Sequence, residues 1–211
     1  MPNHMPYTTE GLPFFGTAPR VWHGMTLPVW LGLLARGGFR VSPGRIPMCL
    51  SITAASVVNS ALAAWEQLVN GRRVAAAEVA PPLLIVGHWR TGTTLLHELI
   101  VRDPQFSFPT TLQTMAPHHF LSSQWLVRPV MQLTMPKRRP MDAMAMGPDL
   151  PQEDEFAVCN LGLDSCYLHW AWPNQRRFEE YLDFAASTPA HPGPWKRKFM
   201  RFLQRLAVGD S

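Results

Sequence analysis

The chain has 211 residues, 46% of them hydrophobic and 16% charged, which is enough apolar material for a buried core and excludes a disordered protein. Its 19 Lys and Arg against 15 Asp and Glu give a net charge of +4, which suits an anionic ligand. The basic residues are scattered, without the aromatic-interleaved stripe of single-strand binders, so we expect no nucleic-acid partner.

Residues 1–45 read as an irregular segment rich in Pro and Gly. The first twenty residues are polar and lack the apolar core and small-residue cleavage site of a secretory signal. Cys49, Cys159 and Cys166 show no C-x-x-C spacing, so neither a disulfide framework nor a zinc site is predicted. Together these features predict a cytoplasmic protein.

Residues 46–65 contain no charged side chain and follow Arg36, Arg40 and Arg45, which raises the question of a membrane. Five hydroxyl or amide side chains interrupt the segment and favour a buried or interfacial helix over a spanning one, with a peripheral membrane contact as one outcome. The alanine-rich pattern predicts a helix over 46–69, ended by Asn70-Gly71.

After Pro81-Pro82, the apolar run 83–86 is typical of a strand buried on both faces, ended by Gly87. A helix is predicted next, with Leu95, Leu96, Leu99 and Ile100 on one apolar face, and it ends before Asp103-Pro104. Residues 106–108 form the next predicted strand, and further helices are predicted over 121–133, 151–163, 178–186 and 195–208.

This pattern predicts an α/β fold, with a P-loop-like parallel sheet and covering helices, that is rich in helix. Two parallel strands cannot stand without neighbours, so we expect the sheet to be incomplete at the C-terminus of this chain. The predicted organisation is an irregular and helical N-terminal region over 1–78, followed by a domain over 79–211.

The segment 87–94, Gly-His-Trp-Arg-Thr-Gly-Thr-Thr, has the G-x-x-x-x-G spacing of a phosphate-binding turn. Thr93-Thr94 stands where a nucleoside triphosphatase needs Lys followed by Ser or Thr, and Arg90 places a cation earlier in the turn. Backbone N–H groups, threonine hydroxyls, the guanidinium and the positive end of the following helix would all converge on one anion.

In sequence the run 83–96 resembles the 5′-phosphosulfate loop of sulfotransferases that use 3′-phosphoadenosine 5′-phosphosulfate. The stretches 108–111, 117–120, 139–142 and 151–156 also resemble the bacterial branch of that family. The resemblance implies that Gly87, Arg90, Thr91, Gly92, Thr93 and Thr94 bind this donor, with Arg90 also catalytic. It also requires an Arg and a Ser for the donor's 3′-phosphate, which we cannot place in this sequence.

The reaction that this resemblance implies is transfer of a sulfuryl group to a hydroxyl or amine of a small-molecule, glycan or lipid acceptor, without a metal. A general base must then take the acceptor's proton, and His118 and Glu153 are our candidates. His119, Asp154 and Glu155 are neighbouring alternatives. Acids in a first helical turn and histidines in a loop also occur for structural reasons alone, so the sequence does not choose among them.

Two other functions remain open at this stage. A nucleotide kinase or similar phosphotransferase would use ATP with magnesium, but the expected lysine after Gly92 is missing. A non-catalytic membrane-associated module built around residues 46–65 would leave the turn without a ligand.

Overall fold

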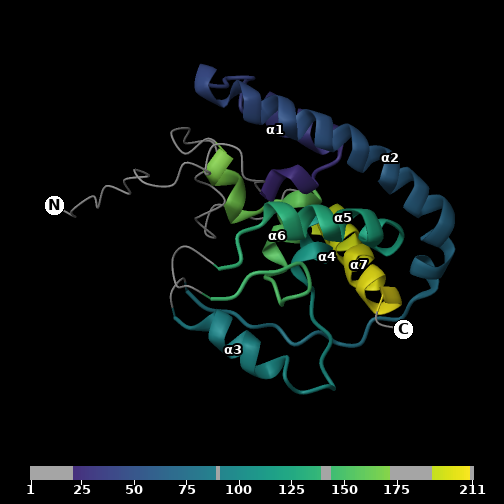
Figure 1. Cartoon of the computed structure of the whole chain (residues 1–211). Helices are drawn as coiled ribbons and strands as arrows, with labels where there is room; N and C mark the ends of the chain where they lie inside the picture. The colour runs from purple at the N-terminus through teal and green to yellow at the C-terminus, as the bar shows by residue number, and fades with distance from the viewer. Residues whose placement is uncertain (1–20, 89–90, 139–143, 172–191, 210–211) are drawn as a thin grey trace.

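The computed structural model describes residues 21–88, 91–138, 144–171 and 192–209, and in this part the chain is built from helices (Figure 1). Helix α2 runs along one side of the body, and α3 lies on the opposite side, beyond α4 to α7. The elements are η1 (Val21–Gly24), α1 (Leu27–Arg36), η2 (Pro43–Arg45), α2 (Ile46–Ala76), α3 (Thr93–Ile100), α4 (Thr111–Met115), α5 (Phe120–Thr134), α6 (Glu155–Asn160), η3 (Cys166–Ala171) and α7 (Pro192–Gly209).

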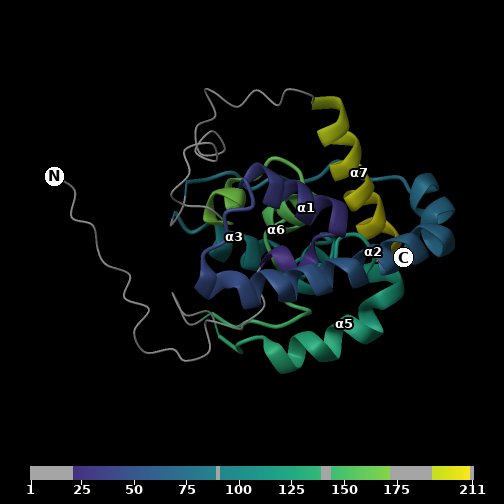
Figure 2. The same cartoon turned by 90° about the horizontal axis from the view of Figure 1, so that it is seen from above.

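Two apolar clusters form the core. The first joins η1, α1 and α2 to α6 and η3 around Met25, Leu33 and Leu168, all fully buried. The second joins α4, α5 and α6 to α7 around Ala157 and Phe202, also fully buried. Helix α2 contacts α1, α5 and α7, and Figure 2 shows α5 and α7 on opposite sides of it. Elements before and after residue 78 therefore pack together, and the proposed division there stays a prediction.

Helix α2 is longer than the sequence predicts. The expected stop at Asn70-Gly71 is wrong, because the helix continues to Ala76. Asn70 does not cap the helix, since its side chain donates a hydrogen bond to Ser122 Oγ at 2.9 Å. Val74 is buried, 2% exposed, and anchors the extra turn. Packing of that turn outweighs the cost of about 1 kcal/mol for a glycine inside a helix.

A buried polar contact ties α2 to α5 and α7. Glu66, 1% exposed, accepts a hydrogen bond from the Ser122 backbone N–H at 2.9 Å through Oε2. Its Oε1 lies 3.9 Å from Nε of Arg205 on α7. A carboxylate this deeply buried is tolerated only with such partners, so the three helices are held in one relative position.

The helix-rich character is confirmed, but the predicted sheet is not found among the described residues. Residues 83–86 and 106–108 form no strand there, and the only pairings are two isolated bridges, Thr110 with Pro151 and Arg138 with Ala145. Leu83, Leu84 and Val86 are 59%, 66% and 91% exposed, the reverse of the predicted burial. A parallel strand is buried only when neighbouring strands and covering helices flank it, and the described residues supply no such neighbours.

The remaining helix predictions agree with the structure only in part. Helices α5 and α7 agree with the predicted ranges 121–133 and 195–208 within a few residues. The predicted helix over 151–163 is reduced to α6, because Pro151 pairs with Thr110 in a bridge instead of beginning a helix. The predicted helix over 178–186 lies outside the described residues.

Candidate active site

The turn before α3 has the tight geometry that its two glycines require. Gly92 has φ +89°, a left-handed conformation that residues with a side chain rarely adopt. A Cβ on Gly87 would lie 2.6 Å from Thr93 Cγ2, so the close approach also needs glycine. Thr91 donates from Oγ1 to the His88 carbonyl oxygen at 2.5 Å, and its N–H donates to the same oxygen at 3.3 Å. The described part of the turn is thus closed on itself.

Helix α3 begins directly after this turn, at Thr93, as the sequence predicts. The first N–H groups of a helix lack partners within it and carry partial positive charge, so they attract an anion. The predicted apolar face of the helix is not buried, since Leu95, Leu96 and Leu99 are 60%, 49% and 54% exposed. This helix instead turns Thr94 and His97 toward the body of the protein, where both line a groove.

The segment that faces α3 is held by backbone hydrogen bonds. Gln152 N–H donates to the Pro109 carbonyl at 2.9 Å, and Thr111 N–H donates to the Leu150 carbonyl at 2.9 Å. At the start of α4, the Thr110 side chain accepts a hydrogen bond from the Gln113 backbone N–H, and the Gln113 side chain accepts one from the Thr110 backbone N–H. This reciprocal cap fixes the chain segment that bonds to Leu150 and Gln152. These bonds place Glu153 opposite the start of α3.

A groove of about 530 Å³ runs between the turn, α3, residues 152–155 and α7. Gly87, Thr93 and Thr94 line it on one side and Glu153 on another. Its remaining wall is mainly apolar and includes Leu83, Ile85, Ile100, Phe106, Phe199, Phe202, Leu203 and Leu206. The volume suits a ligand of small-molecule size with an apolar portion.

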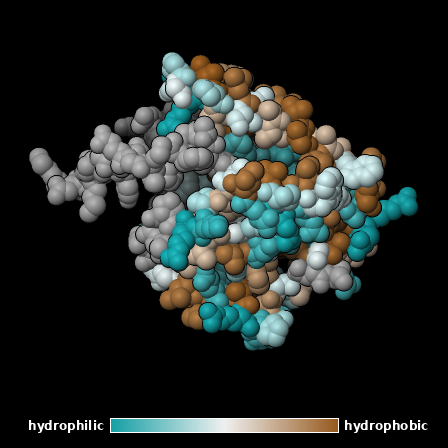
Figure 3. All heavy atoms as spheres, viewed as in Figure 1, coloured by the Kyte–Doolittle hydropathy of each residue, from teal (hydrophilic) through white to brown (hydrophobic). Residues whose placement is uncertain are grey.

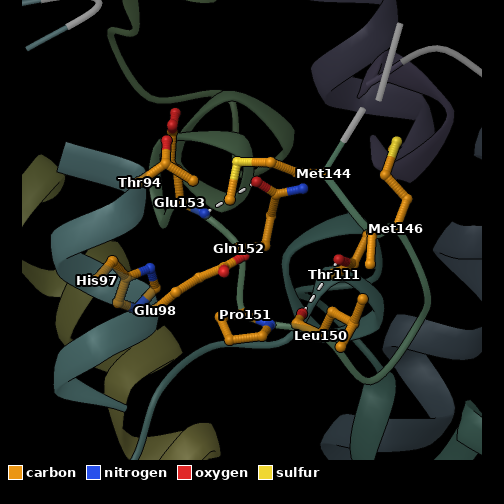
Figure 4. Close-up of a pocket in the computed structure, with 11 residues that line it drawn as sticks. Thr94, His97, Glu98, Thr111, Met144, Met146, Leu150, Pro151, Gln152 and Glu153 are labelled. Carbon is orange, nitrogen blue, oxygen red and sulfur yellow. Dashed lines mark hydrogen bonds between the residues drawn. The ribbon is translucent and has the colours of Figure 1, made fainter. Parts of the chain in front are cut away.

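A small polar recess of about 30 Å³ opens beside this groove, and Thr94, His97, Gln152 and Glu153 line both. Figure 4 shows Thr94 and His97 projecting from α3 toward the segment that carries Gln152 and Glu153. The recess is completed by Glu98, Thr111, Met144, Ala145, Met146, Leu150 and Pro151. The start of α3 and a carboxylate therefore meet at one point.

The carboxylate at this point is oriented by a neighbour. Tyr167, in η3, donates from its hydroxyl to Glu153 Oε2 at 2.6 Å. Burial and the adjacent Glu153 charge raise the pKa of the Tyr167 hydroxyl, so Tyr167 stays protonated and keeps donating. The other oxygen, Oε1, is the atom that would be free to accept a proton from a substrate.

The acids next to Glu153 have different surroundings. Desolvation raises the pKa of Asp154, which precedes α6, and also that of Glu155. Glu155 Oε1 accepts a hydrogen bond from the Cys166 backbone N–H at 3.2 Å and so fastens η3 to α6. Both line the groove, but Glu155 has a structural contact that Glu153 Oε1 lacks.

The histidine pair lies away from the groove. His118 Nε2 donates to the Asn160 carbonyl oxygen at 3.1 Å, and the His119 ring contacts Ser123 Oγ at 2.6 Å and Asn59 Oδ1 at 3.2 Å. Desolvation lowers the pKa of each to about 4, so both are neutral near pH 7. The geometry favours Glu153 over His118 as the base, and both assignments remain predictions.

Arg90, the predicted donor-binding cation, lies outside the described residues. None of the described residues that line the groove is Lys or Arg, whereas three are acidic. In the described part of this groove, the start of α3 is therefore the feature that would attract an anion. Among the described residues, no cluster of three His, Cys, Asp or Glu side chains could hold a metal ion.

Two residues at this site were missed in the sequence. His97 was not among the predicted site residues, yet it lines both the groove and the recess, in edge-to-face contact with Phe108 at 6.4 Å between ring centroids. Tyr167 belongs to no sequence motif. Only the hydrogen bond from its hydroxyl to Glu153 indicates that it orients this carboxylate. For His97, its position one helical turn after the threonine pair of the predicted phosphate-binding turn was the one signal available.

The start of α3 and the Glu153 carboxylate, which Tyr167 orients, thus line one groove. The sequence model of the sulfotransferase family matches residues 81–199, more than half of the chain, and the chain belongs to that family. The turn, α3 and most of the groove's lining lie within the matched range, and Phe202, Leu203 and Leu206 of the lining lie just beyond it.

Two curated relatives share 44% identity with the chain over 191 residues, which are 90% of this chain and 49% of theirs. Both carry the name omega-hydroxy-beta-dihydromenaquinone-9 sulfotransferase Stf3, one from Mycobacterium bovis and one from Mycobacterium tuberculosis. The chain thus spans about half the length of these relatives. No solved structure matches the chain at a significant level.

Proposed function

We propose that this site transfers a sulfuryl group from 3′-phosphoadenosine 5′-phosphosulfate to a hydroxyl of a lipid-like acceptor in the cytoplasm. The observation that carries the proposal is that Thr94, at the start of α3, and Glu153 line the same groove and the same recess. Family membership supports the reaction class, and the apolar wall of the groove supports an acceptor with an apolar chain.

The donor's 5′-phosphosulfate would bind at Gly87, Arg90, Thr91, Gly92, Thr93 and Thr94. Backbone N–H groups at the start of α3 and the Arg90 guanidinium would stabilise the negative charge that grows on the phosphate oxygen as its bond to sulfur breaks. Thr93 and Thr94 line the groove and can donate hydroxyl hydrogen bonds to the same group. The same proposal includes a binding site for the donor's 3′-phosphate. It also includes the parallel sheet that is expected for this family.

Glu153 would act as the base. Its Oε1 takes the proton of the acceptor hydroxyl while the acceptor oxygen forms a bond to sulfur, and the sulfur–oxygen bond to the 5′-phosphate breaks. Adenosine 3′,5′-bisphosphate leaves with the bonding electrons. Tyr167 keeps the carboxylate pointed at the groove by its hydrogen bond to Oε2.

The acceptor class follows from the relatives and the groove. The relatives are named for a hydroxylated menaquinone derivative, and an apolar wall made by Ile100, Phe199 and Leu203 would hold a comparable apolar chain here. Because such acceptors reside in lipid, residues 46–65 would make the peripheral membrane contact that the sequence suggested. An ω-hydroxylated isoprenoid quinol is therefore the first acceptor to test.

Calorimetric titration separates this proposal from the kinase alternative. We expect adenosine 3′,5′-bisphosphate to bind and ATP with magnesium not to bind. Loss of one charge-assisted contact in Arg90→Ala should weaken binding by about 1.5–3 kcal/mol, roughly 10- to 150-fold. Arg102→Ala removes an exposed arginine just after α3 and should leave binding unchanged. Tighter binding of ATP with magnesium would refute the proposal.

The role of Glu153 needs a separate measurement. Sulfuryl transfer from the labelled donor to the hydroxylated acceptor should fall at least about 100-fold in Glu153→Gln, because the amide cannot take the proton while it still accepts the Tyr167 hydrogen bond. Glu78→Gln, the same change at an exposed site, should retain the wild-type rate. Full activity in Glu153→Gln, with a loss in His118→Gln at unchanged stability, would transfer the role to His118.

A further inference from the structure

Helix α2 is amphipathic, but its polar side faces the protein and its apolar side faces outward, which is the reverse of an ordinary surface helix. Most of its uncharged polar side chains point into the protein and have hydrogen-bond partners there, whereas Ser51 and Gln67 are exposed. Thr53 Oγ1 accepts from Trp30 Nε1 at 3.0 Å, Asn59 Nδ2 donates to the Met25 carbonyl at 3.0 Å, and Ser60 Oγ accepts from the Leu27 N–H at 2.8 Å. Ser56, Glu66 and Asn70 face the same way and are buried.

The outward side of α2 is apolar. Seven large apolar side chains there are between 47% and 81% exposed: Ile46, Leu50, Val57, Val58, Trp65, Leu68 and Val69. At 100° per residue they fall within an arc of about 140°, which also includes the exposed Ala54, Ala61 and Ala64. We call these ten residues the outer face of α2. In Figure 3 hydrophobic residues follow the edge of the molecule where α2 runs.

The charges around the outer face are almost all positive. Residues 21–77 contain five arginines and one acidic residue, Glu66, so this stretch alone carries +4, as much as the whole chain. Glu66 is buried beside Arg205 and does not offset the surface charge. Arg45 stands exposed just before the helix, and Arg72 and Arg73 stand exposed near its end. A contiguous apolar surface of this kind is expected to be covered by a partner.

The packing of α2 fixes how such a partner can meet it. By length and composition α2 is the one described helix that could cross a membrane, but its inner side is bonded to α1, α5 and the segment before α1. At 1.5 Å per residue its 31 residues extend about 46 Å, beyond the roughly 30 Å of a hydrocarbon core. A surface bonded along one side can only lie flat, with the outer face toward the partner.

We propose that α2 lies in the plane of an anionic lipid bilayer, with its outer face among the acyl chains and Arg45, Arg72 and Arg73 among the headgroups. Apolar side chains over an arc of this width, flanked by cations and with no exposed acid on the helix itself, match the pattern of helices that bind at the membrane interface. The exposed acid Glu78 lies two residues past the end of the helix. Trp65 stands on the outer face as an aromatic side chain suited to the headgroup boundary. This surface deepens the membrane contact of the proposed function and rests on that contact, not on the sulfuryl-transfer step.

Flotation of the 211-residue chain with lipid vesicles tests the surface without donor or acceptor, so a failure here is separate from a failure of the reaction. We expect the chain to float with phosphatidylcholine vesicles that contain 30% phosphatidylglycerol, and less with pure phosphatidylcholine. The triple variant Leu50→Glu, Val57→Glu, Leu68→Glu should bind vesicles more than about 100-fold more weakly. It loses three apolar side chains that would be buried in the bilayer, and it gains three negative charges.

The matched control is Leu95→Glu, an equally exposed leucine on α3 at the opposite side of the molecule, which should float like the wild type. Glutamate has a helix propensity similar to that of leucine and higher than that of valine, and all four sites are exposed, so the variants should keep their fold, as circular dichroism can confirm. Wild-type chain that stays unbound to both vesicles would overturn the proposal. Dimerisation of that unbound chain, abolished by the triple variant, would assign the outer face to a second copy instead.

Discussion

Lowering the pH from 7 to 5 should destabilise this protein through its two buried histidines. Desolvation lowers the pKa of His118 and His119 from 6.5 to about 4 in the folded protein. The unfolded chain therefore binds more protons than the folded one throughout this window. Stability is fully present above pH 6.5 and is lost as the pH falls toward 4.

The size of the effect follows from the two pKa values. A histidine with a pKa of 6.5 unfolded and about 4 folded costs about 2 kcal/mol between pH 7 and pH 5. Proximity of the two rings further lowers the pKa of His119, so the pair should cost about 3–4 kcal/mol together. A typical domain has about 5–15 kcal/mol in total, so much of its stability should vanish.

Urea unfolding at pH 7 and pH 5 measures this loss. The raised pKa values of Asp154 and Glu155 act in the opposite direction, so the informative quantity is the difference in pH dependence between wild type and variant. His118→Gln and His119→Gln should each remove about 2 kcal/mol of the pH dependence. A pH dependence in both variants equal to that of the wild type would refute the reasoning.

Two further predictions concern stability. Gly92→Ala should lower the free energy of unfolding by about 1 kcal/mol or more because its φ of +89° is strained for alanine, whereas Gly44→Ala, with open space around it, should not; urea denaturation compares them. Arg205→Met should cost about 3–5 kcal/mol because Glu66 would stay buried without its cation, while Arg128→Met, which breaks an exposed ion pair, should cost less than about 1 kcal/mol; thermal unfolding would contradict this if both variants melted alike.

The turn and the helix after it were predictable because their signals are local. The left-handed backbone at Gly92 and the close approach of Gly87 to Thr93 are both accessible to glycine without strain and not to other residues. The spacing of the two glycines therefore already specifies the bend. The start of α3 at Thr93 follows from it. Glu153 could be proposed from the sequence, but its selection over His118 required the groove.

The failures arise where burial depends on distant parts of the chain. An apolar run such as 83–86 indicates a strand that is buried by its neighbours, but the run does not specify which neighbours are present. Gly71 resembled a helix stop, and only the packing of Val74 shows why the helix continues. Residues 46–65 were predicted to form a buried or interfacial helix with polar interruptions. Those interruptions are in fact its inner side, and periodicity alone cannot assign inside and outside.

The segment 83–86, in which Leu83, Leu84 and Val86 are exposed, leads directly into the turn that begins at Gly87. An extended apolar run with open backbone N–H and C=O groups is a template onto which another strand can add. Any strand that pairs there would also set the angle at which the chain enters the turn. Ligand affinity at this turn should consequently depend on which strand, if any, pairs with residues 83–86.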